Sequence, residues 1–375
     1  MNDIQTVPVE LGKDRYDITI GSGLLADLGA SLKTLLAPER VTVITDQNVS
    51  RLYARTIVDA LEGAGIACKT LTIPPGEGSK SWETAKRLYD GLAERRHTRT
   101  HPIVALGGGV VGDLAGFVAA TWMRGVPVVQ CPTTLEAAID AAVGGKTAIN
   151  HEAGKNLIGA FQQPKAVICD VDCLKTLDPR HFRAAIAESI KHALISDPAF
   201  LDWHEANLSH VLALDRSAVT SLIATNCEIK AAVVADDERE DLTGPPRRAA
   251  LNFGHTFGHA FETLPDIGLL HGEAVSLGMV AELDLAVRHV GLPDSDRERA
   301  EELIRSLQSV VKYDLKAAAG AVFEKMKLDK KVVGGVRFAV PSRLGRTEWL
   351  ENVPVESLQA ALSRVIGFCE GRPAD

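Results

Sequence analysis

The first half of the chain alternates short apolar runs with longer amphipathic runs. The short runs are rich in β-branched residues, which is typical of buried strands. In the longer runs apolar residues recur every three or four positions, as in helices with one buried face. Strands are expected at residues 16–20, 40–45, 68–73, 102–106, 126–131 and 166–170, and helices at 24–36, 49–63, 82–96 and 112–123. This alternation predicts an α/β domain in which crossover helices join the parallel strands of a doubly wound sheet.

The second half has helical periods and few strand-like runs. Helices are expected at residues 182–195, 218–234, 252–263, 273–290, 294–310 and 355–368, and a small hairpin at 334–340 and 346–350. A charged stretch at residues 236–248 carries Gly244, Pro245 and Pro246 and is expected to be a loop. We therefore expect two domains, an α/β domain over residues 1–178 and a mostly α-helical domain over residues 179–375.

Length and composition fit a soluble globular protein of two domains. The 375 residues are 46% hydrophobic and 24% charged, which is ordinary for a globular protein. The net charge of -8 and the absence of a dense basic stripe argue against a nucleic-acid partner. An anionic ligand must therefore be held by Lys and Arg side chains placed locally around it.

Cysteine usage and hydropathy favour the cytoplasm. The six cysteines form no C-x-x-C pair, and a chain of this length needs no disulfides for stability. The first fifteen residues are polar and charged, without the apolar core of a secretion signal. No apolar run approaches the length of a membrane span, so no membrane partner is expected.

A glycine-rich turn is the first candidate binding motif. Gly107–Gly112 follows an expected strand, opens an expected helix and satisfies G-x-G-x-x-G, so its backbone amides could face a pyrophosphate. The usual dinucleotide fingerprint lies in the first βα turn, however, and a structural turn is the alternative. Asp46 ends a strand and could bind a ribose or cap the helix at Val49. The loop from Gly76 to Lys80 could likewise reach a cofactor or cap the next helix.

Three cations beside glycines indicate an anion site. Val143–Thr147 resembles the end of a Walker A loop but lacks its first glycine, so that interpretation fails. Lys146, Lys155 and Arg124 remain, each next to a glycine within about thirty residues. One such cation would be ordinary surface decoration, whereas three favour a bound anion.

The stretch Leu251–Ala260 carries the strongest chemical signal. On a helix Asn252, His255 and His259 would share one face, and the glycines beside the histidines would let a partner approach. Spacing alone pairs His255 with His259 as metal ligands, but H-E-x-x-H is absent because Thr256 follows His255. Hydrogen-bonded structural histidines are the alternative.

Two further residues extend this signal. His271 follows a short way downstream, and Glu188 lies three residues before Lys191 on another expected helix. Glu188 could form an intrahelical ion pair with Lys191 or serve as a hard metal ligand. Histidine and carboxylate ligands suit Zn²⁺, which typically keeps three protein ligands and one open position in catalytic sites.

Taken in order, these motifs resemble the 3-dehydroquinate synthases. The resemblance runs from about residue 43 to residue 331 and includes nine segments in the family's order: GEGSKS, ALGGGVVGDLAGFVAATWMRG, PTTL, VGGKTAIN, GKNLIGAF, AESIKHALI, LNFGHTFGHA, LHGEAV and LDKK. It implies a Rossmann-like NAD-binding domain followed by a helical domain that binds metal and substrate. It also implies a cytoplasmic homodimer with NAD as a recycled cofactor and Zn²⁺, or Co²⁺, as the metal.

The resemblance assigns roles to individual residues. The implied metal ligands are Glu188, His255 and His271, which leaves His259 as a catalytic residue that binds no metal. Implied NAD contacts are Asp46, Asn48, Glu77, Lys80, Gly108, Gly109, Asp113, Thr133, Thr134, Lys146, Lys155 and Thr176. Implied substrate contacts are Asp140, Lys146, Asn156, Lys191, Lys230, Arg248, Asn252, Arg124 acting across a dimer interface, and Lys330, beside which Lys331 is an alternative.

The implied reaction converts 3-deoxy-D-arabino-heptulosonate 7-phosphate into 3-dehydroquinate by oxidation, phosphate elimination, reduction, ring opening and aldol closure. The segment Glu136–Ala142 departs from the family pattern and raises the alternative of a cyclase acting on sedoheptulose 7-phosphate or glucose 6-phosphate. Such cyclases tend to alter the residues equivalent to Asn252 and His259, so their retention favours dehydroquinate synthase. The sequence also leaves open a metal-dependent polyol dehydrogenase and a nucleotide-binding module that has lost its catalytic residues.

Overall fold

The computed structural model describes residues 4–12, 14–237, 246, 248–262, 264, 268–307, 322 and 337–370. They form two compact units, of which the first comprises Met1–Leu177 and Leu214–Ala235 and the second Asp178–Ala213 and Asp236–Asp375. The expected division after residue 178 puts residues 214–235 in the second domain, whereas their packing puts them in the first unit. A helical period alone does not tell which core a helix joins.

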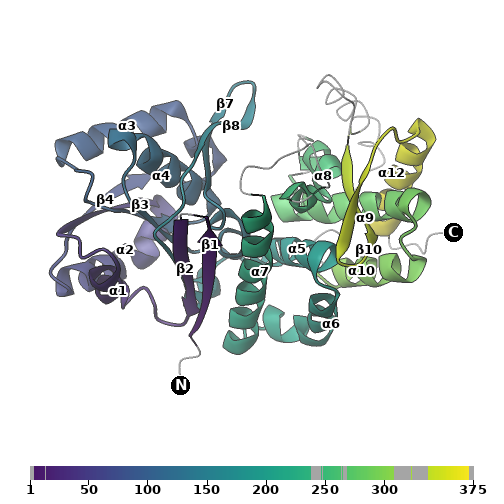
Figure 1. Cartoon of the computed structure of the whole chain (residues 1–375), viewed down its shortest axis with the longest axis horizontal. Coiled ribbons are helices and arrows are strands. Elements are labelled where there is room, and N and C mark those ends of the chain that lie inside the picture. Colours follow the sequence, from purple (N-terminus) through teal and green to yellow (C-terminus); the bar gives the residue numbers. More distant parts are fainter. Residues whose placement is uncertain are drawn as a thin grey trace. The chain divides into compact units, whose positions relative to one another are not determined.

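The first unit contains a seven-stranded sheet, in the order β1-β2-β9-β6-β5-β3-β4. Figure 1 labels β1, β2, β3 and β4 of this sheet. Only β1 and β2 pair antiparallel within this sheet, and the other neighbours are parallel. Its strands are β1 (Gln5–Leu11), β2 (Asp14–Gly21), β3 (Arg40–Asp46), β4 (Ala67–Ile73), β5 (Ile103–Gly107), β6 (Val128–Pro132) and β9 (Ala166–Asp170). The expected doubly wound arrangement is confirmed.

Helices cover both faces of this sheet because its strands are apolar on both sides. On β5, Ile103 and Ala105 point into one buried cluster, and Val104 and Leu106 point into another. Strand side chains alternate between faces, so each cluster belongs to one face. The helices of the unit are α1 (Leu28–Leu35), α2 (Gln47–Gly63), α3 (Trp82–Glu94), α4 (Gly109–Thr121) and α7 (Arg216–Asp236).

Shorter elements complete the first unit. A separate hairpin joins β7 (Lys146–His151) to β8 (Gly154–Phe161), and neither strand was expected from the sequence. Short helical segments are η1 (Glu77–Ser79), η2 (Trp122–Arg124), the π-helical η3 (Ala137–Ala141) and η4 (Val171–Thr176). Within the described part of the chain, α7 alone is long and apolar enough to cross a membrane, and 61% of the relevant window is buried in the protein. A core helix passes the same test.

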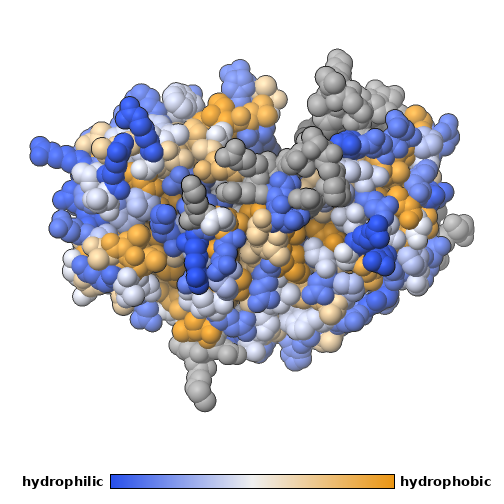
Figure 2. Space-filling view, in the orientation of Figure 1, coloured by the Kyte–Doolittle hydropathy of each residue, from blue (hydrophilic) through white to orange (hydrophobic). Residues whose placement is uncertain are grey.

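The second unit is mostly helical. Its elements are α5 (Pro179–Ser196), α6 (Pro198–Leu212), η5 (Arg248–Asn252), α8 (His255–Glu262), α9 (His271–Val290), α10 (Asp294–Ser306), α12 (Val355–Cys369) and the hairpin β10 (Phe338–Arg343) with β11 (Arg346–Leu350). The central helix is α9, which contacts α5, α8, α10, α12 and β10 and buries most of its length (Figure 1). On the visible surface, Figure 2 shows hydrophilic side chains mixed with smaller hydrophobic patches.

Glycines let α9 approach two neighbours at backbone distance. A Cβ added to Gly278 would lie 1.8 Å from the carbonyl oxygen of Gly254, just before α8. A Cβ added to Gly272 would lie 2.0 Å from the carbonyl oxygen of Ala184 on α5. Gly254, the glycine before His255, therefore allows the backbone of α9 to approach. The sequence predicted a close approach at this glycine but did not identify the approaching segment.

One boundary differs from expectation in a way that matters for the site. The expected helix 252–263 begins only at His255, because Gly254 has a φ of +79° and separates it from η5. Asn252 belongs to η5 and is not on the face of α8 that carries the histidines. The expected positions 263, 308–310 and 334–336 lie outside the described residues.

Candidate active site

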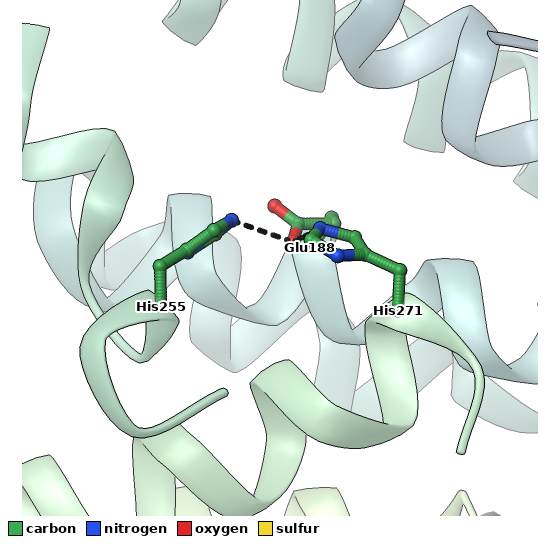
Figure 3. A group of neighbouring side chains, drawn as sticks. All are labelled: Glu188, His255 and His271. Carbon is green, nitrogen blue, oxygen red and sulfur yellow. Dashed lines mark ion pairs between the residues drawn. The ribbon is translucent and has the colours of Figure 1, made fainter. Parts of the chain in front are cut away.

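Three helices of the second unit bring together Glu188, His255 and His271 (Figure 3). Glu188 projects from the middle of α5, and the histidines are the first residues of α8 and α9. Both Nε2 atoms face the same carboxylate oxygen, Glu188 Oε1, at 3.6 Å from His255 and 3.5 Å from His271. One potential ligand atom from each residue lies within 4.8 Å of the others, a spacing that can accommodate a metal ion.

The charges of this cluster suit a divalent cation. Glu188 is almost fully buried, and Lys191 forms an ion pair with its Oε2. Burial would raise the pKa of Glu188, but the neighbouring Lys191 ammonium holds it well below its usual range, so the group is ionised. Burial lowers the pKa of His255 to about 3, which keeps the imidazole neutral. A carboxylate and neutral imidazoles are ligands that Zn²⁺ accepts.

Hydrogen bonds fix the direction in which each imidazole faces. His255 Nδ1 lies 3.1 Å from the carbonyl oxygen of Phe253, which can only accept, so Nδ1 donates and Nε2 keeps its lone pair. His271 Nδ1 lies 3.3 Å from a carboxylate oxygen of Glu262. Metal-bound histidines usually donate their other ring N–H to a carbonyl or carboxylate in this way. Glu262 was not singled out in the sequence, because nothing in its spacing marks it.

His259 lies beside Glu188, His255 and His271 and outside this candidate ligand group. Its ring centroid is 5.4 Å from that of His255 and 6.3 Å from that of His271. The candidate ligand group around His255 is completed by Glu188 and His271. The spacing argument that paired His255 with His259 is therefore not supported by the geometry. His259 is exposed, so it can meet a ligand that binds at the metal cluster.

The candidate NAD contacts of the first unit gather at one edge of its sheet. β3, β4, β5, β6 and β9 are parallel, so their carboxyl ends share that edge, where α/β proteins bind nucleotides. The loops and helix starts that follow these strands carry Asp46, Asn48, Glu77, Lys80, Gly108, Gly109, Asp113, Thr133, Thr134 and Thr176. The other two, Lys146 and Lys155, lie on the β7–β8 hairpin.

Lys80 organises the polar groups at this edge. Its buried ammonium donates to Asp113 Oδ2 at 2.7 Å and to the side-chain oxygen of Asn156, and lies 3.7 Å from Glu77. Burial raises the pKa of Asp113, and the charge of Lys80 opposes that rise. Asn150 links Glu77 to the backbone of Asn156, whose φ is +58°. The network thus joins candidate NAD contacts to a candidate substrate contact.

One of the open interpretations at this edge is resolved locally. Asp46 Oδ1 accepts the N–H groups of Asn48 at 2.7 Å and Val49 at 3.0 Å, so Asp46 caps α2. The capping interpretation is thereby confirmed, and its other oxygen, Oδ2, is not used in the cap. Gly108 forms the turn before α4, where an added Cβ would lie 3.0 Å from the side chain of Thr134.

The candidate substrate contacts fall into both units. In the first, Lys230 of α7 donates to the backbone oxygen of Asp140 at 2.6 Å and to its carboxylate at 2.5 Å. Arg124 also belongs to the first unit, is exposed and has a φ of +67°. In the second unit Lys191 and Arg248 are buried, Asn252 is exposed, and Lys330 and Lys331 lie outside the described residues.

Sequence models of one enzyme family cover both units. The model of the 3-dehydroquinate synthase N-terminal region matches residues 70–184, and that of the C-terminal region matches residues 185–332. The 3-dehydroquinate synthase of Desulforamulus reducens is 44% identical over 361 residues, 96% of this chain and 99% of its own length. That of Azotobacter vinelandii is 45% identical over 361 residues, 96% of each chain.

Solved structures of cyclases share the fold. The 2-epi-5-epi-valiolone synthase of Streptomyces hygroscopicus subsp. jinggangensis, solved with NAD⁺ and Zn²⁺, has a TM-score of 0.84 at 27% identity and covers 95% of this chain and 98% of its own. A 2-deoxy-scyllo-inosose synthase has a TM-score of 0.86 at 23% identity, over 96% of this chain and 99% of its own, which shows the fold alone. By the family models and the identity over nearly its whole length, this chain belongs to the 3-dehydroquinate synthase family.

Proposed function

We propose that this chain is a 3-dehydroquinate synthase of the shikimate pathway. It converts 3-deoxy-D-arabino-heptulosonate 7-phosphate into 3-dehydroquinate and phosphate, and is thus a carbon–oxygen lyase that closes a carbocycle. The observation that carries this proposal is the convergence of Glu188, His255 and His271, with His259 beside them, in a chain 44% identical to a 3-dehydroquinate synthase. The presence of Asn252 and His259 favours this substrate over those of other sugar-phosphate cyclases.

We propose NAD and Zn²⁺ as the cofactors, with Co²⁺ as a competent substitute. Glu188, His255 and His271 hold the metal, and the carboxyl edge of the sheet in the first unit holds NAD. Bound NAD would accept and return a hydride, and the metal would act as a Lewis acid on the substrate alcohol. The related valiolone synthase was solved with NAD⁺ and Zn²⁺, and the inosose synthase with NAD⁺ and Co²⁺.

The chain's own side chains bind and orient the substrate in this proposal. Lys146, Lys191, Lys230 and Arg248 neutralise its carboxylate and phosphate, since Arg and Lys are the usual partners of such groups. Asp140 holds the ammonium of Lys230 in place. His259 relays a proton, and Asn252 orients a hydroxyl; both are exposed and stand outside the metal ligand set.

A homodimer in the cytoplasm is the proposed state of the enzyme. The β7–β8 hairpin exposes Leu157, Ile158 and Phe161, of which Leu157 is 62% and Phe161 52% accessible, and Figure 2 shows hydrophobic surface at this hairpin. Apolar patches of this kind commonly mark interfaces. The exposed Arg124 would then reach the substrate phosphate of the partner. Sedimentation analysis tests the assembly, and a monomer at micromolar concentration would contradict it.

One assay tests the function. Purified chain is incubated with the heptulosonate phosphate, NAD⁺ and Zn²⁺ while phosphate, dehydroquinate and NADH are followed together. Phosphate and dehydroquinate in equal amounts, without net NADH, are expected. Turnover of sedoheptulose 7-phosphate in place of this substrate would make the chain a different cyclase, and stoichiometric NADH release would make it a dehydrogenase.

A further inference from the structure

A buried carboxyl group outside the candidate ligand group, that of Glu282, holds the backbone on both sides of His255. Glu282 lies on α9, in the second unit, and its side chain is fully buried. Its Oε2 accepts the N–H of Gly254 at 2.7 Å, and its Oε1 accepts the N–H of Phe257 at 3.4 Å. The first N–H groups of a helix have no partner within the helix, so this side chain supplies acceptors that α8 itself lacks.

Further contacts also restrict the segment that Glu282 binds. Gly254 adopts a φ of +79°, and its carbonyl lies so close to Gly278 that no Cβ would fit between them. Phe257 is fully buried. His255 lies between these two anchored residues, and its Nδ1 is hydrogen-bonded to the carbonyl of Phe253. The direction of His255 Nε2 is therefore set by the backbone that Glu282 binds.

A second carboxylate of α9 plays the matching part at His271. Glu273 Oε2 accepts the N–H of Leu270 at 2.8 Å, and both Glu273 oxygens accept from Arg180 of α5 at 2.7 Å. Arg180 also donates to the carbonyl of Gly268. The segment just before His271 is thus tied to α5, the helix that carries Glu188. In a similar way, Glu282 ties the segment around His255 to α9.

We propose that Glu282 is a positioning residue of the metal centre, which acts on metal affinity and coordination through the backbone around His255. This inference rests on the metal site of the proposed function. Residues that orient metal ligands typically change metal affinity by about 10- to 100-fold when they are replaced.

Glu282→Gln tests the proposal with nearly unchanged side-chain volume, because an amide nitrogen cannot accept one of the two backbone N–H groups. The matched control is Asp284→Asn, a buried carboxylate two residues further along α9 that pairs with Arg288 at 2.6 Å. Zn²⁺ affinity is measured by competition with a chromophoric chelator, and the visible absorption of the Co²⁺-loaded protein reports the coordination geometry. Circular dichroism and thermal melting of the metal-free proteins report folding.

Glu282→Gln is expected to weaken Zn²⁺ binding by about 10- to 100-fold and to alter the Co²⁺ spectrum. Asp284→Asn is expected to lower the melting temperature while keeping affinity within about twofold and the spectrum unchanged. Equal affinity and spectrum in Glu282→Gln and wild type, or an equal loss of affinity in Asp284→Asn, would overturn the proposal. Should Glu282→Gln not fold, Glu282→Asp is measured in its place, because it keeps the carboxyl group on a shorter side chain. Weaker Zn²⁺ binding and an altered Co²⁺ spectrum are expected of it as well, and wild-type values of both would overturn the proposal. A wild-type chain that binds no metal would instead overturn the proposed function.

Discussion

Two imidazoles on α8, four residues apart, have different surroundings. His255 is held by a backbone carbonyl and faces Glu188 together with His271, whereas His259 is exposed outside this group. His255→Ala is therefore expected to lose the metal. His259→Ala should keep metal and NAD while turnover falls by about 10²- to 10⁴-fold, the usual contribution of a general acid or base. Metal analysis of both purified variants, with single-turnover kinetics of the second, checks this; metal loss from His259→Ala would place it in the ligand set.

Lys80 is a second residue whose environment gives a definite expectation. Its ammonium is buried against Asp113, so Lys80→Met leaves that carboxylate without its cation. Removal of one partner of a buried pair costs about 3 kcal/mol or more. Urea unfolding at pH 7 measures the loss. Lys86→Met is the control, because the Lys86–Asp90 pair is exposed and is worth about 0.5 kcal/mol or less; equal losses in the two variants would contradict the expectation.

Only part of the site could be predicted at the level of residues. The motifs identified Glu188, His255 and His271 by resemblance, and the spacing of LNFGHTFGHA alone pointed to His255 with His259. Glu262 and Glu282 bind His271 and the backbone around His255 through hydrogen bonds that form only once α8 and α9 are packed. No local period marks such contacts, so they could not be found in the sequence.

The contact between α8 and α9 depends on Gly278. Gly278→Ala would place a methyl group 1.8 Å from a backbone oxygen, which cannot move away as a flexible side chain could. Overpacking of this kind costs about 1 to 3 kcal/mol, and the upper end is expected here. Gly367→Ala on α12 is the control, because its Cβ meets nothing within 4 Å and alanine favours a helix by about 1 kcal/mol. The melting temperatures of the two variants are compared with that of wild type. A wild-type melting temperature for Gly278→Ala would show that α8 and α9 can move apart to accommodate the methyl group.

The sequence predicted most of the regular elements. The parallel strands of the first unit and the long helices other than α6 were expected to within a few residues. β1 was missed because Gln5–Leu11 is an edge strand that contains Pro8 and the charged Glu10. The β7–β8 hairpin was missed because β8 is largely exposed and contains glycine, so it has no alternating buried face. α6 was also missed, although its apolar positions are no less regular than those of α7, which was expected.

For the whole molecule, metal removal should lower stability through the second unit. A ligand present at about 100 times its dissociation constant stabilises a folded protein by about 2.7 kcal/mol. Chelation of Zn²⁺-loaded wild type is therefore expected to lower the free energy of unfolding by about this amount and to abolish turnover. His255→Ala should be insensitive to the chelator. The comparison is made by urea unfolding with and without chelator, and equal sensitivity of both proteins would place the metal elsewhere.

Acid should weaken the first unit at Asp172. Burial alone would raise the pKa of Asp172, but hydrogen bonds from Lys175, Ser22 and Arg216 lower it to about 2. Since the folded pKa is below the ordinary value of about 3.9, ionised Asp172 stabilises the fold above pH 4, and this is lost as the pH falls towards 2. Its partners are partly exposed, so the contribution is about 1 kcal/mol.

Asp172→Asn tests this expectation. The variant should be less stable than wild type at pH 7, and the difference should shrink as the pH approaches 2. Urea unfolding at both pH values measures it, with Asp59→Asn as the control because the Arg55–Asp59 pair is exposed. A stability difference that is the same at both pH values would show that the Asp172 ion pairs are not its source.

The return of α7 to the first unit governs the order in which the two units can fold during synthesis. Arg216, Cys227 and Lys230 reach back to Asp172, Ala138 and Asp140. The ribosome must therefore release residues 178–213 of the second unit before it delivers the helix that completes the first. Folding from the N-terminus as each domain emerges, the usual order for chains of several domains, cannot finish here before residue 235 is available. A gene cut after residue 178 would yield a fragment without its last core helix.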